Sequence, residues 1–322
     1  MVSSIFTPAE EAVKEKSAFK FLVYGDAGTG KTRFGLTFPN SVIIDSEDGY
    51  RAYLRKGSDL AKNVKGIVRT QSYSDVEKGI KELLRSKLKG VDTLIIDSET
   101  VIRENIEEAL MTVEEARARK ANRDELDANL SQRSWGKIKY IDNGLKNMKI
   151  RLSSKGGNIL SIAQQRDVTD DNGKVIGSRP NMKKKAEHDY DVVLRFFVED
   201  GRFLAEVEKD RFNVFKKGEI IENPTFNMWG DKYDLDGQEH DLSYDEDVNK
   251  SKQVYEDNVA EQDLDSKPLV EQLGARVKKL SKEDKTRFAK QIKEDFGIDA
   301  KQLGKATQTQ LEAVIDLLKA EY

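Results

Sequence analysis

The fold is decided by the stretch Gly25-Asp26-Ala27-Gly28-Thr29-Gly30-Lys31-Thr32, which has the pattern G-x-x-x-x-G-K-T of a phosphate-binding loop. Residues 19–24, before it, are aromatic and β-branched, as a buried strand is. Residues 33–38, after it, suit a helix that Pro39-Asn40 would end. Glycines let several backbone N–H groups point at one phosphate chain, and a helix N-terminus adds a positive dipole end. The pattern therefore predicts a nucleoside triphosphate site.

The residues of this loop have predictable tasks. Lys31 would reach the β- and γ-phosphates, and the Thr32 hydroxyl would ligate Mg²⁺. The alternative, a glycine-rich turn with an incidental lysine, would not require a strand before the loop and a helix after it. We expect the nucleotide to be contacted by Gly25, Asp26, Ala27, Gly28, Thr29, Gly30, Lys31, Thr32 and Arg33.

The composition excludes several classes of site. The chain has 322 residues, enough for about two domains, and a formal net charge of −3, so nucleic-acid binding would have to come from local basic patches. It has no cysteine, which excludes disulfides, cysteine zinc sites and thiol nucleophiles, and only two histidines. No apolar run approaches the ~20 residues of a membrane span, and the N-terminus lacks the pattern of a signal peptide. We therefore expect a soluble, cytoplasmic protein without membrane contact.

Three further apolar runs predict buried strands, and polar residues follow each of them. The first ends in Asp45-Ser46-Glu47, the second in Asp97-Ser98-Glu99, and the third, residues 158–163, in Gln164-Gln165-Arg166. In open α/β sheets ligands lie at the carboxyl ends of the strands. The run into Asp97 is typical of a Walker B segment, whose aspartate holds Mg²⁺ together with Thr32. The alternative for Asp97 is an ordinary polar strand end.

The remaining pattern predicts the fold class. Residues 101–152 are helical in pattern, with a stripe expected to face the core: Trp135, Ile138, Ile141, Leu145, Met148 and Leu152. A polar hairpin is expected to turn at Asp170-Asp171-Asn172-Gly173, and a second hairpin at Asp200-Gly201. Buried strands that alternate with helices, followed by hairpins, predict an α/β fold whose mainly parallel sheet has an antiparallel extension.

The composition changes after this core, and we expect three segments. Residues 1–235 would form the α/β core. Residues 236–266 are rich in Asp and Glu and poor in apolar periodicity, which predicts a disordered acidic linker. Residues 267–322 would form a small all-α module of about three helices, with capping boxes that begin at Ser281 and Thr307. Its basic faces suit DNA or a protein partner equally.

Taken in order, the phosphate loop and the strands that end at Glu47, Asp97 and Gln164 resemble the RecA-type ATPase core. The resemblance implies ATP and Mg²⁺ as cofactors and a P-loop ATPase activity. It gives Glu47 the role of the general base that activates the attacking water, although Asp48 competes for this role. It makes Gln164 a sensor of the γ-phosphate that is coupled to a DNA-binding loop.

RecA-like ring proteins such as RadA and DnaB carry a Lys-x-Arg on a late strand, which reaches the nucleotide of the neighbouring subunit. Lys209-Asp210-Arg211 resembles that motif, so the resemblance places Lys209 and Arg211 among the catalytic residues. The alternative for Arg211 is a salt bridge at the end of a strand.

Over about residues 17–230 the chain is most similar to phage nucleotide-binding proteins of the RecA-like Sak type. This resemblance implies a bacteriophage protein in the cytoplasm of an infected host, which hydrolyses ATP, binds single-stranded DNA and promotes annealing or strand exchange in DNA recombination. It also implies a homo-oligomer, either a ring or a filament. A single-strand DNA-binding protein is a further candidate partner, through the C-terminal region.

DNA contact is expected from the basic residues that follow Gln164, although a lysine triplet is often only a solvated loop. These residues are Arg166, Arg179, Lys183, Lys184 and Lys185. Two other functions remain open. One is a ring-forming replication motor or loader, and the other is a non-catalytic protein whose assembly is switched by nucleotide.

Overall fold

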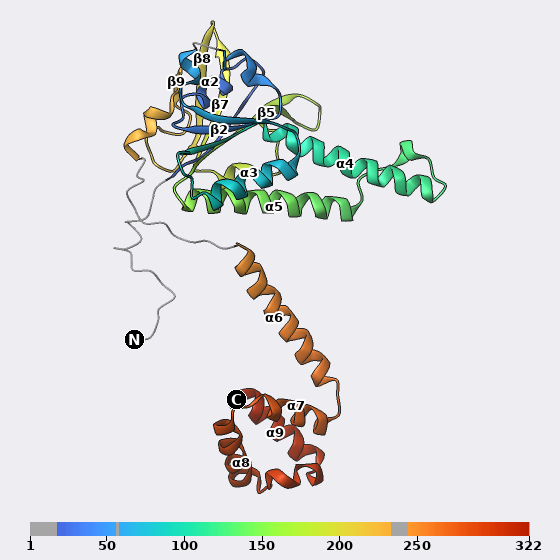
Figure 1. Cartoon of the computed structure of the whole chain (residues 1–322). Coiled ribbons are helices and arrows are strands. Elements are labelled where there is room, and N and C mark those ends of the chain that lie inside the picture. The colour runs from blue at the N-terminus through green and yellow to red at the C-terminus, as the bar shows by residue number, and fades with distance from the viewer. Residues whose placement is uncertain (1–17, 56–57, 233–243, 322) are drawn as a thin grey trace. The chain divides into compact units, whose positions relative to one another are not determined.

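The computed structural model describes residues 18–55, 58–232 and 244–321, and the chain divides into two compact units, Met1–Leu242 and Ser243–Tyr322 (Figure 1). The first unit is α/β and the second is helical, which confirms the predicted fold class. In the part of the chain that the structure describes, no helix is both long and apolar enough to cross a membrane.

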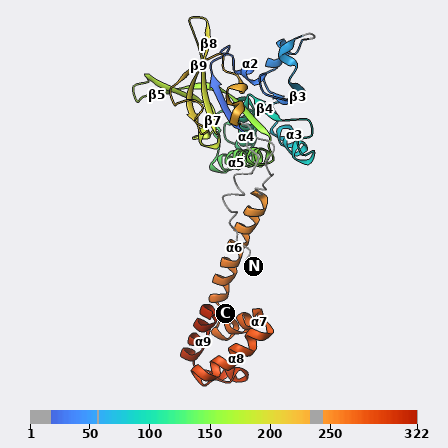
Figure 2. The same cartoon turned by 90° about the vertical axis from the view of Figure 1, so that its left-hand side faces the viewer.

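The first unit is built on one sheet with the strand order β3-β2-β4-β5-β1-β7-β8-β9, and β6 pairs with β5 outside this path (Figures 1 and 2). Strands β3 to β7 in this order are parallel, whereas β8, β9 and β6 pair in antiparallel fashion. The edge strand β3 was not predicted from the sequence. The strands are β1 (Lys20–Gly25), β2 (Ser41–Asp45), β3 (Val64–Arg69), β4 (Thr93–Asp97), β5 (Asn158–Thr169), β6 (Val175–Pro180), β7 (Val192–Glu199), β8 (Arg202–Asp210) and β9 (Ile220–Glu222).

Helices cover both faces of this sheet (Figure 1). On one face α3, α4 and α5 pack on apolar side chains of β2, β4 and β5. The other face is covered by α2 and by two short 3-10 helices, η1 and η5. The helices that cover the faces are α2 (Lys31–Gly35), η1 (Gly49–Ala52), α3 (Tyr73–Arg85), α4 (Glu99–Lys120), α5 (Gln132–Ser154) and η5 (Phe226–Lys232). A further short helix, η4 (Ala186–Asp189), precedes β7.

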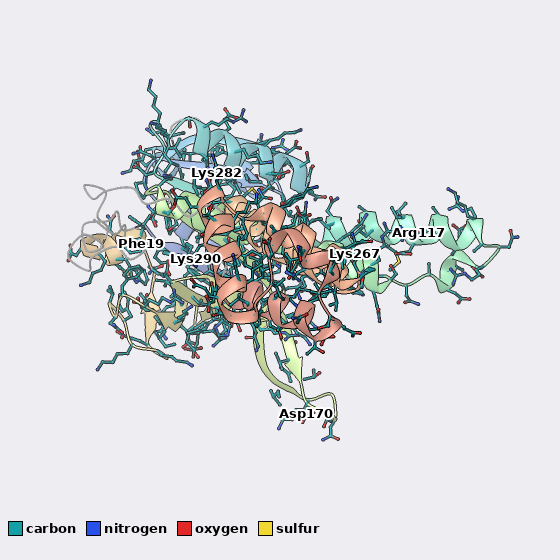
Figure 3. The ribbon with its side chains drawn as sticks, turned by 90° about the horizontal axis from the view of Figure 1, so that it is seen from below. Phe19, Arg117, Asp170, Lys267, Lys282 and Lys290 are labelled. Atoms are coloured by element: carbon teal, nitrogen blue, oxygen red, sulfur yellow. The ribbon has the colours of Figure 1, made fainter. Side chains whose placement is uncertain are left out.

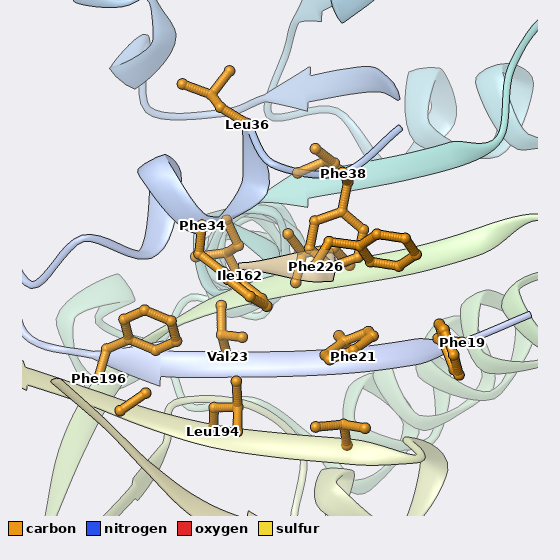
Figure 4. Packing of buried hydrophobic residues seen from close by; sticks show 14 of the residues in the cluster. Phe19, Phe21, Val23, Phe34, Leu36, Phe38, Ile162, Leu194, Phe196 and Phe226 are labelled. Atoms are coloured by element: carbon orange, nitrogen blue, oxygen red, sulfur yellow. The ribbon is translucent and has the colours of Figure 1, made fainter. Parts of the chain in front are cut away.

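The strand β1 lies in the middle of the core and is surrounded by aromatic rings (Figure 4). The ring of Phe21 meets Phe38 at a centroid distance of 5.3 Å and Trp229 at 5.2 Å, both edge to face. Phe34, on α2, packs on Phe21 at 5.9 Å. Edge-to-face pairs of this kind add about 0.5–1.5 kcal/mol each beyond the area that they bury. The aromatic composition of residues 19–24 thus fixes the strand that leads into the phosphate loop.

The predicted apolar stripe on α5 is buried only in part. Ile138, Leu145 and Leu152 are buried, as predicted, but Trp135 keeps 48% of its surface exposed, so the prediction was wrong for this residue. The distal parts of α4 and α5 run beyond the sheet, near the labelled Arg117 in Figure 3. Because no sheet lies under the beginning of α5, Trp135 has no core to enter.

The predicted disordered linker is a helix over most of its length. Residues 233–243, which include its beginning, lie outside the described residues, but α6 spans Tyr244–Asp265. Ion pairs between side chains three or four positions apart, such as Lys252 with Glu256 at 3.3 Å, support a helix that has few apolar contacts. Arg276 binds both Glu261 and Asp265 and anchors the end of α6 to α7.

The helical module has a core of its own, which explains why so few residues can form it. The helices are α7 (Leu269–Lys279), α8 (Lys282–Phe296) and α9 (Gln308–Glu321). Phe288, Ile292 and Val314 are almost completely buried between them. The predicted capping box at Thr307 is reciprocal, because the Thr307 hydroxyl accepts a hydrogen bond from the Gln310 N–H at 3.3 Å and the Gln310 side chain accepts one from the Thr307 N–H at 2.9 Å. Ser281 caps its helix by accepting a hydrogen bond from the Asp284 N–H at 3.1 Å.

Gly25 and Gly28 offer a test of the packing around β1. A Cβ at Gly25 would lie 2.2 Å from the carbonyl oxygen of Phe196, whereas a Cβ at Gly28 would meet no atom within 4 Å. Both residues have positive φ angles, so both substitutions carry backbone strain. We expect Gly25→Ala to lower the free energy of unfolding by about 3 kcal/mol and Gly28→Ala by about 1 kcal/mol, in urea denaturation without nucleotide. Equal losses would contradict the close approach of β1 and β7.

Candidate nucleotide-binding and hydrolysis site

The carboxyl ends of four parallel strands meet at one edge of the sheet, as the sequence predicts. Asp45 of β2 is paired in register with Asp97 of β4, and Gly25 of β1 with Gln164 of β5. The phosphate loop, Glu47 and Asp97 line one cleft at this edge. The structure therefore brings together Lys31, Thr32, Glu47, Asp97 and Gln164. The first and last of these are 133 positions apart along the chain, and they meet because the strands that carry them to this edge are parallel.

The phosphate loop is shaped by left-handed glycines and by its own lysine. Gly28 and Gly30 have φ angles of 75° and 97°. The Lys31 ammonium donates hydrogen bonds to the carbonyl oxygens of Gly25 at 2.8 Å and Asp26 at 2.6 Å. Burial lowers the pKa of Lys31, while the carboxylates of Asp97 and Glu47 oppose this shift. The ammonium is thus held at the mouth of the loop, where a phosphate chain would lie.

The helix after the loop is shorter than predicted. It was expected over residues 33–38, but α2 has five residues, Lys31–Gly35, and the chain then turns through bonds from Thr37 N–H to the Phe34 carbonyl and from Phe38 N–H to the Gly35 carbonyl. Because so short a helix has a small dipole, the loop N–H groups are the main anion-binding feature.

Thr32 and Asp97 form a pair of oxygen ligands that fits Mg²⁺. The Thr32 hydroxyl donates to an Asp97 carboxylate oxygen at 3.0 Å, and Asp97 is only 6% exposed. Burial raises the pKa of Asp97 to about 6, against the effect of the Thr32 hydrogen bond. In the described part of the chain no cluster of three or more His, Cys, Asp or Glu side chains is placed to hold a metal. This donor set suits Mg²⁺, which proteins commonly bind through one or two side chains together with substrate phosphates.

The structure separates Glu47 from its competitor Asp48. One carboxylate oxygen of Glu47 accepts hydrogen bonds from the Ser98 hydroxyl at 2.6 Å and from the Gln164 amide at 2.9 Å. Asp48 instead forms an ion pair with Arg69 at 2.8 Å. Glu47 therefore faces the cleft with one oxygen held by two donors, which fixes the direction of the other oxygen.

Ser98 is a site residue that the sequence analysis did not single out. Besides contacting Glu47, its backbone N–H donates to the Ser46 hydroxyl at 2.7 Å, and that hydroxyl donates to the Ser98 carbonyl at 3.0 Å. The two serines tie the loop after β2 to the loop after β4. A signal was present in the sequence, because both strands end in Asp-Ser-Glu, at residues 45–47 and 97–99.

The expected DNA-binding residues fall into two groups. Arg166 and Arg179 are exposed and face each other across the β5–β6 pair, on a hairpin that projects from the sheet and has Asp170 at its tip (Figure 3). Lys184 and Lys185 are exposed on the following loop, whereas Lys183 forms an ion pair with Asp189 at 2.5 Å. The predicted turn is present, since the Asp170 N–H donates to the Lys174 carbonyl at 2.9 Å.

Lys209 and Arg211 are not brought to the phosphate loop of their own chain. Because β8 runs antiparallel to β7, with Asp210 opposite Val192, both residues lie at the other edge of the sheet. The Lys209 ammonium donates to the carbonyl oxygens of Glu187 and Tyr190, and burial lowers its pKa. Arg211 pairs with Asp191 at 3.3 Å, which is the salt bridge that the alternative interpretation expects.

A protein-family model described as an AAA domain matches residues 17–219, from the start of β1 to the segment before β9. The chain belongs to the AAA-domain family. The matched segment of this AAA domain contains the phosphate loop, Glu47, Asp97 and Gln164. The family is one of P-loop nucleotide-binding proteins, and the mostly parallel sheet with an antiparallel extension is the α/β architecture that the sequence predicts.

Solved structures also resemble this AAA domain. One of them is described as the crystal structure of the RadB recombinase; it has 12% sequence identity and a TM-score of 0.43, and the match covers 65% of this chain and 87% of that one. A search of curated proteins found no match.

The raised pKa of Asp97 gives a prediction for stability. An aspartate with a folded-state pKa of about 6, above its ordinary 3.8, binds its proton more tightly when folded, so stability falls as pH rises between these values. Asp97→Asn removes this cost and keeps an acceptor for Thr32. We expect the variant to gain on the order of 1–3 kcal/mol in free energy of unfolding at pH 8, without Mg²⁺ or nucleotide, and to match the wild type near pH 4. A less stable variant at pH 8 would contradict the unfavourable burial of this charge.

Proposed function

We propose that this chain hydrolyses ATP and couples hydrolysis to the binding of single-stranded DNA, in annealing or strand exchange. The observation that carries the proposal is the contact between the Gln164 amide and the Glu47 carboxylate. It lies where β5 leaves the core and continues as the projecting hairpin with Arg166 and Arg179. Gln164, which contacts the candidate general base Glu47, is thus two positions from Arg166, a candidate DNA-binding residue.

The residues of the cleft match the needs of phosphoryl transfer to water. Lys31 is held beside the loop that would bind the β- and γ-phosphates, and Thr32 with Asp97 would hold Mg²⁺, which neutralises phosphate charge when bound. Glu47 is oriented by Ser98 and would position the attacking water and accept its proton. Positioning and charge neutralisation are the main contributions that a protein makes to this reaction.

The DNA part of the proposal rests on the hairpin and the loop after it. Arg166 and Arg179 offer two exposed guanidinium groups side by side, which suits contact with a phosphate backbone. Val175 and Ile176, near the tip, are 53% and 63% exposed and could contact unstacked bases. The loop is tied to Gln164, because the Asn181 N–H donates to the Gln164 carbonyl at 2.8 Å.

Assembly into a homo-oligomer belongs to the same proposal. Lys209 and Arg211 lie away from the phosphate loop of their own chain, so a catalytic role for them requires the nucleotide of a neighbouring copy. Arg211 keeps 58% of its side chain exposed while it pairs with Asp191, and it would have to exchange this partner for a phosphate. The bacteriophage origin and a single-strand DNA-binding protein as partner come from the resemblance alone.

The proposal is tested by ATP hydrolysis of the full chain with and without single-stranded DNA. We expect DNA to stimulate hydrolysis, Lys31→Ala to abolish it, and Arg166→Ala/Arg179→Ala to weaken DNA affinity roughly tenfold through lost phosphate contacts. The charge-matched control is Arg133→Ala/Lys137→Ala, at exposed positions of α5, which should bind DNA as the wild type does. A rate of ATP hydrolysis that DNA does not change would favour a partner-driven motor or loader. The absence of any hydrolysis would favour a non-catalytic protein whose assembly is switched by nucleotide.

Glu47 and Asp48 give a second test, directed at the chemistry. Glu47→Gln keeps an acceptor for Ser98 but removes the base, so we expect hydrolysis to fall by about 10²- to 10⁴-fold while ATP still binds. Asp48→Asn breaks an exposed ion pair with Arg69 and should change the rate little. Steady-state kinetics and equilibrium nucleotide binding measure the two effects separately. A larger loss in Asp48→Asn than in Glu47→Gln would reverse the assignment.

A further inference from the structure

We propose that the nucleobase of the bound triphosphate lies in a second pocket beside the phosphate loop, against Phe203 and Arg33. The proposal rests on the proposed function in one respect, since it requires a nucleotide in the loop. The pocket, of about 120 Å³, is lined by residues of α2, of the β7–β8 hairpin and of the segment after β9. Gly30, Arg33 and Phe203 also line the phosphate cleft, so the two hollows are adjacent.

The direction of the phosphate chain identifies this pocket as the nucleoside end. Two groups would contact the γ-phosphate and Mg²⁺: Asp97, the last residue of β4, and Glu47, which follows β2. Both strands lie on one side of β1 in the sheet. The strands β7 and β8 lie on the other side of β1. A triphosphate whose terminal phosphate faces Asp97 therefore directs its nucleoside toward the β7–β8 hairpin.

One wall of the pocket is a stacking surface. The guanidinium carbon of Arg33 lies 5.7 Å from the centroid of the Phe203 ring. The ring also lies close under the loop, since a Cβ at Gly30 would be 3.3 Å from a ring carbon of Phe203. Aromatic rings and arginine guanidinium groups are surfaces on which every nucleobase can stack, because every base has a π-face.

The segment Asn223 to Thr225, which also lines the pocket, is held beside Phe203 and Thr37 by backbone N–H groups. The Asn223 N–H donates to the Phe203 carbonyl at 2.9 Å, and the Phe226 N–H donates to the Thr37 hydroxyl at 2.9 Å. Pro224 is buried, and Asn223 has a φ angle of 47°. Among the described residues the side-chain amide of Asn223 has no hydrogen-bond partner, so it is available to the edge of a base. The pocket therefore combines an aromatic stacking surface with polar side chains, among them the Asn223 amide.

The same hairpin supplies a matched control. Phe197 on β7 lies under the guanidinium group of Arg195 at 5.0 Å, a pair of the same kind as Phe203 with Arg33. Phe196, the neighbour of Phe197, lines the pocket, and successive residues of a strand point to opposite faces. Phe197→Ala thus removes an arginine-stacked aromatic ring from the face that does not line the pocket.

The test compares binding of ATP with binding of inorganic tripolyphosphate to the full chain, by competition against a fluorescent nucleotide. Stacking of one base corresponds to about a tenfold to hundredfold change in affinity. We expect Phe203→Ala to weaken ATP binding by that factor and to leave tripolyphosphate binding unchanged. Asn223→Gly, which tolerates the positive φ, should weaken only ATP binding as well. Phe197→Ala should bind both ligands as the wild type does.

The outcomes separate this inference from the proposed function. If the wild type binds ATP no more tightly than tripolyphosphate, or if Phe203→Ala retains the full preference for ATP, the base does not use this pocket and the inference is overturned. If Phe203→Ala and Phe197→Ala lose ATP affinity equally, the effect belongs to the hairpin and not to the pocket, which also overturns it. If the wild type binds neither ligand, the proposed function itself fails.

Discussion

The backbone of β1 passes between β5 and β7 with no space for a side chain at its end, and the rest of the first unit depends on this fit. Gly25 lies against the carbonyl oxygen of Phe196 on one side and is paired with Gln164 on the other. The position of β1 therefore determines where the phosphate loop begins. Through its pairing with β5 and β7 it also determines where Gln164 and the β7–β8 hairpin lie beside that loop. The aromatic rings around Phe21 hold that strand in the core. The packing of the core therefore determines the position of the phosphate loop.

Three carboxylates lie at this edge of the sheet, and each accepts hydrogen bonds from its own set of donors. Asp45 accepts hydrogen bonds from three backbone N–H groups of the loop that follows it. Glu47 is held by Ser98 and Gln164, and Asp97 by Thr32. For Asp97 the hydrogen bond does not offset desolvation, because burial raises its pKa to about 6. A divalent cation beside it would stabilise the charged carboxylate, which is a physical reason for this site to bind a cation such as Mg²⁺.

Sequence alone predicted the strands that converge on the site, because each is a buried apolar run with polar residues at its end. It missed β3, whose residues Val64–Arg69 are half exposed and include Lys65 and Gly66, so no apolar run marks them. It placed Trp135 in the core, since periodicity does not show where a sheet ends beneath a helix. Spacing along the chain could not decide between Glu47 and Asp48 or locate Arg211, because a partner such as Arg69 and the direction of β8 are set by tertiary structure.

The strand β5 is continuous from Asn158 in the core to Thr169 in the projecting hairpin, without glycine or proline. From Ile159 to Ile162 it is paired on both sides, with β1 and β4, whereas from Gln165 onward it is paired with β6 alone. An extended backbone is nearly inextensible along its length. Any displacement of the Gln164 backbone along the strand would therefore carry Arg166 with it by a similar amount. A movement at the cleft end of β5 would then reach the hairpin surface along one continuous strand.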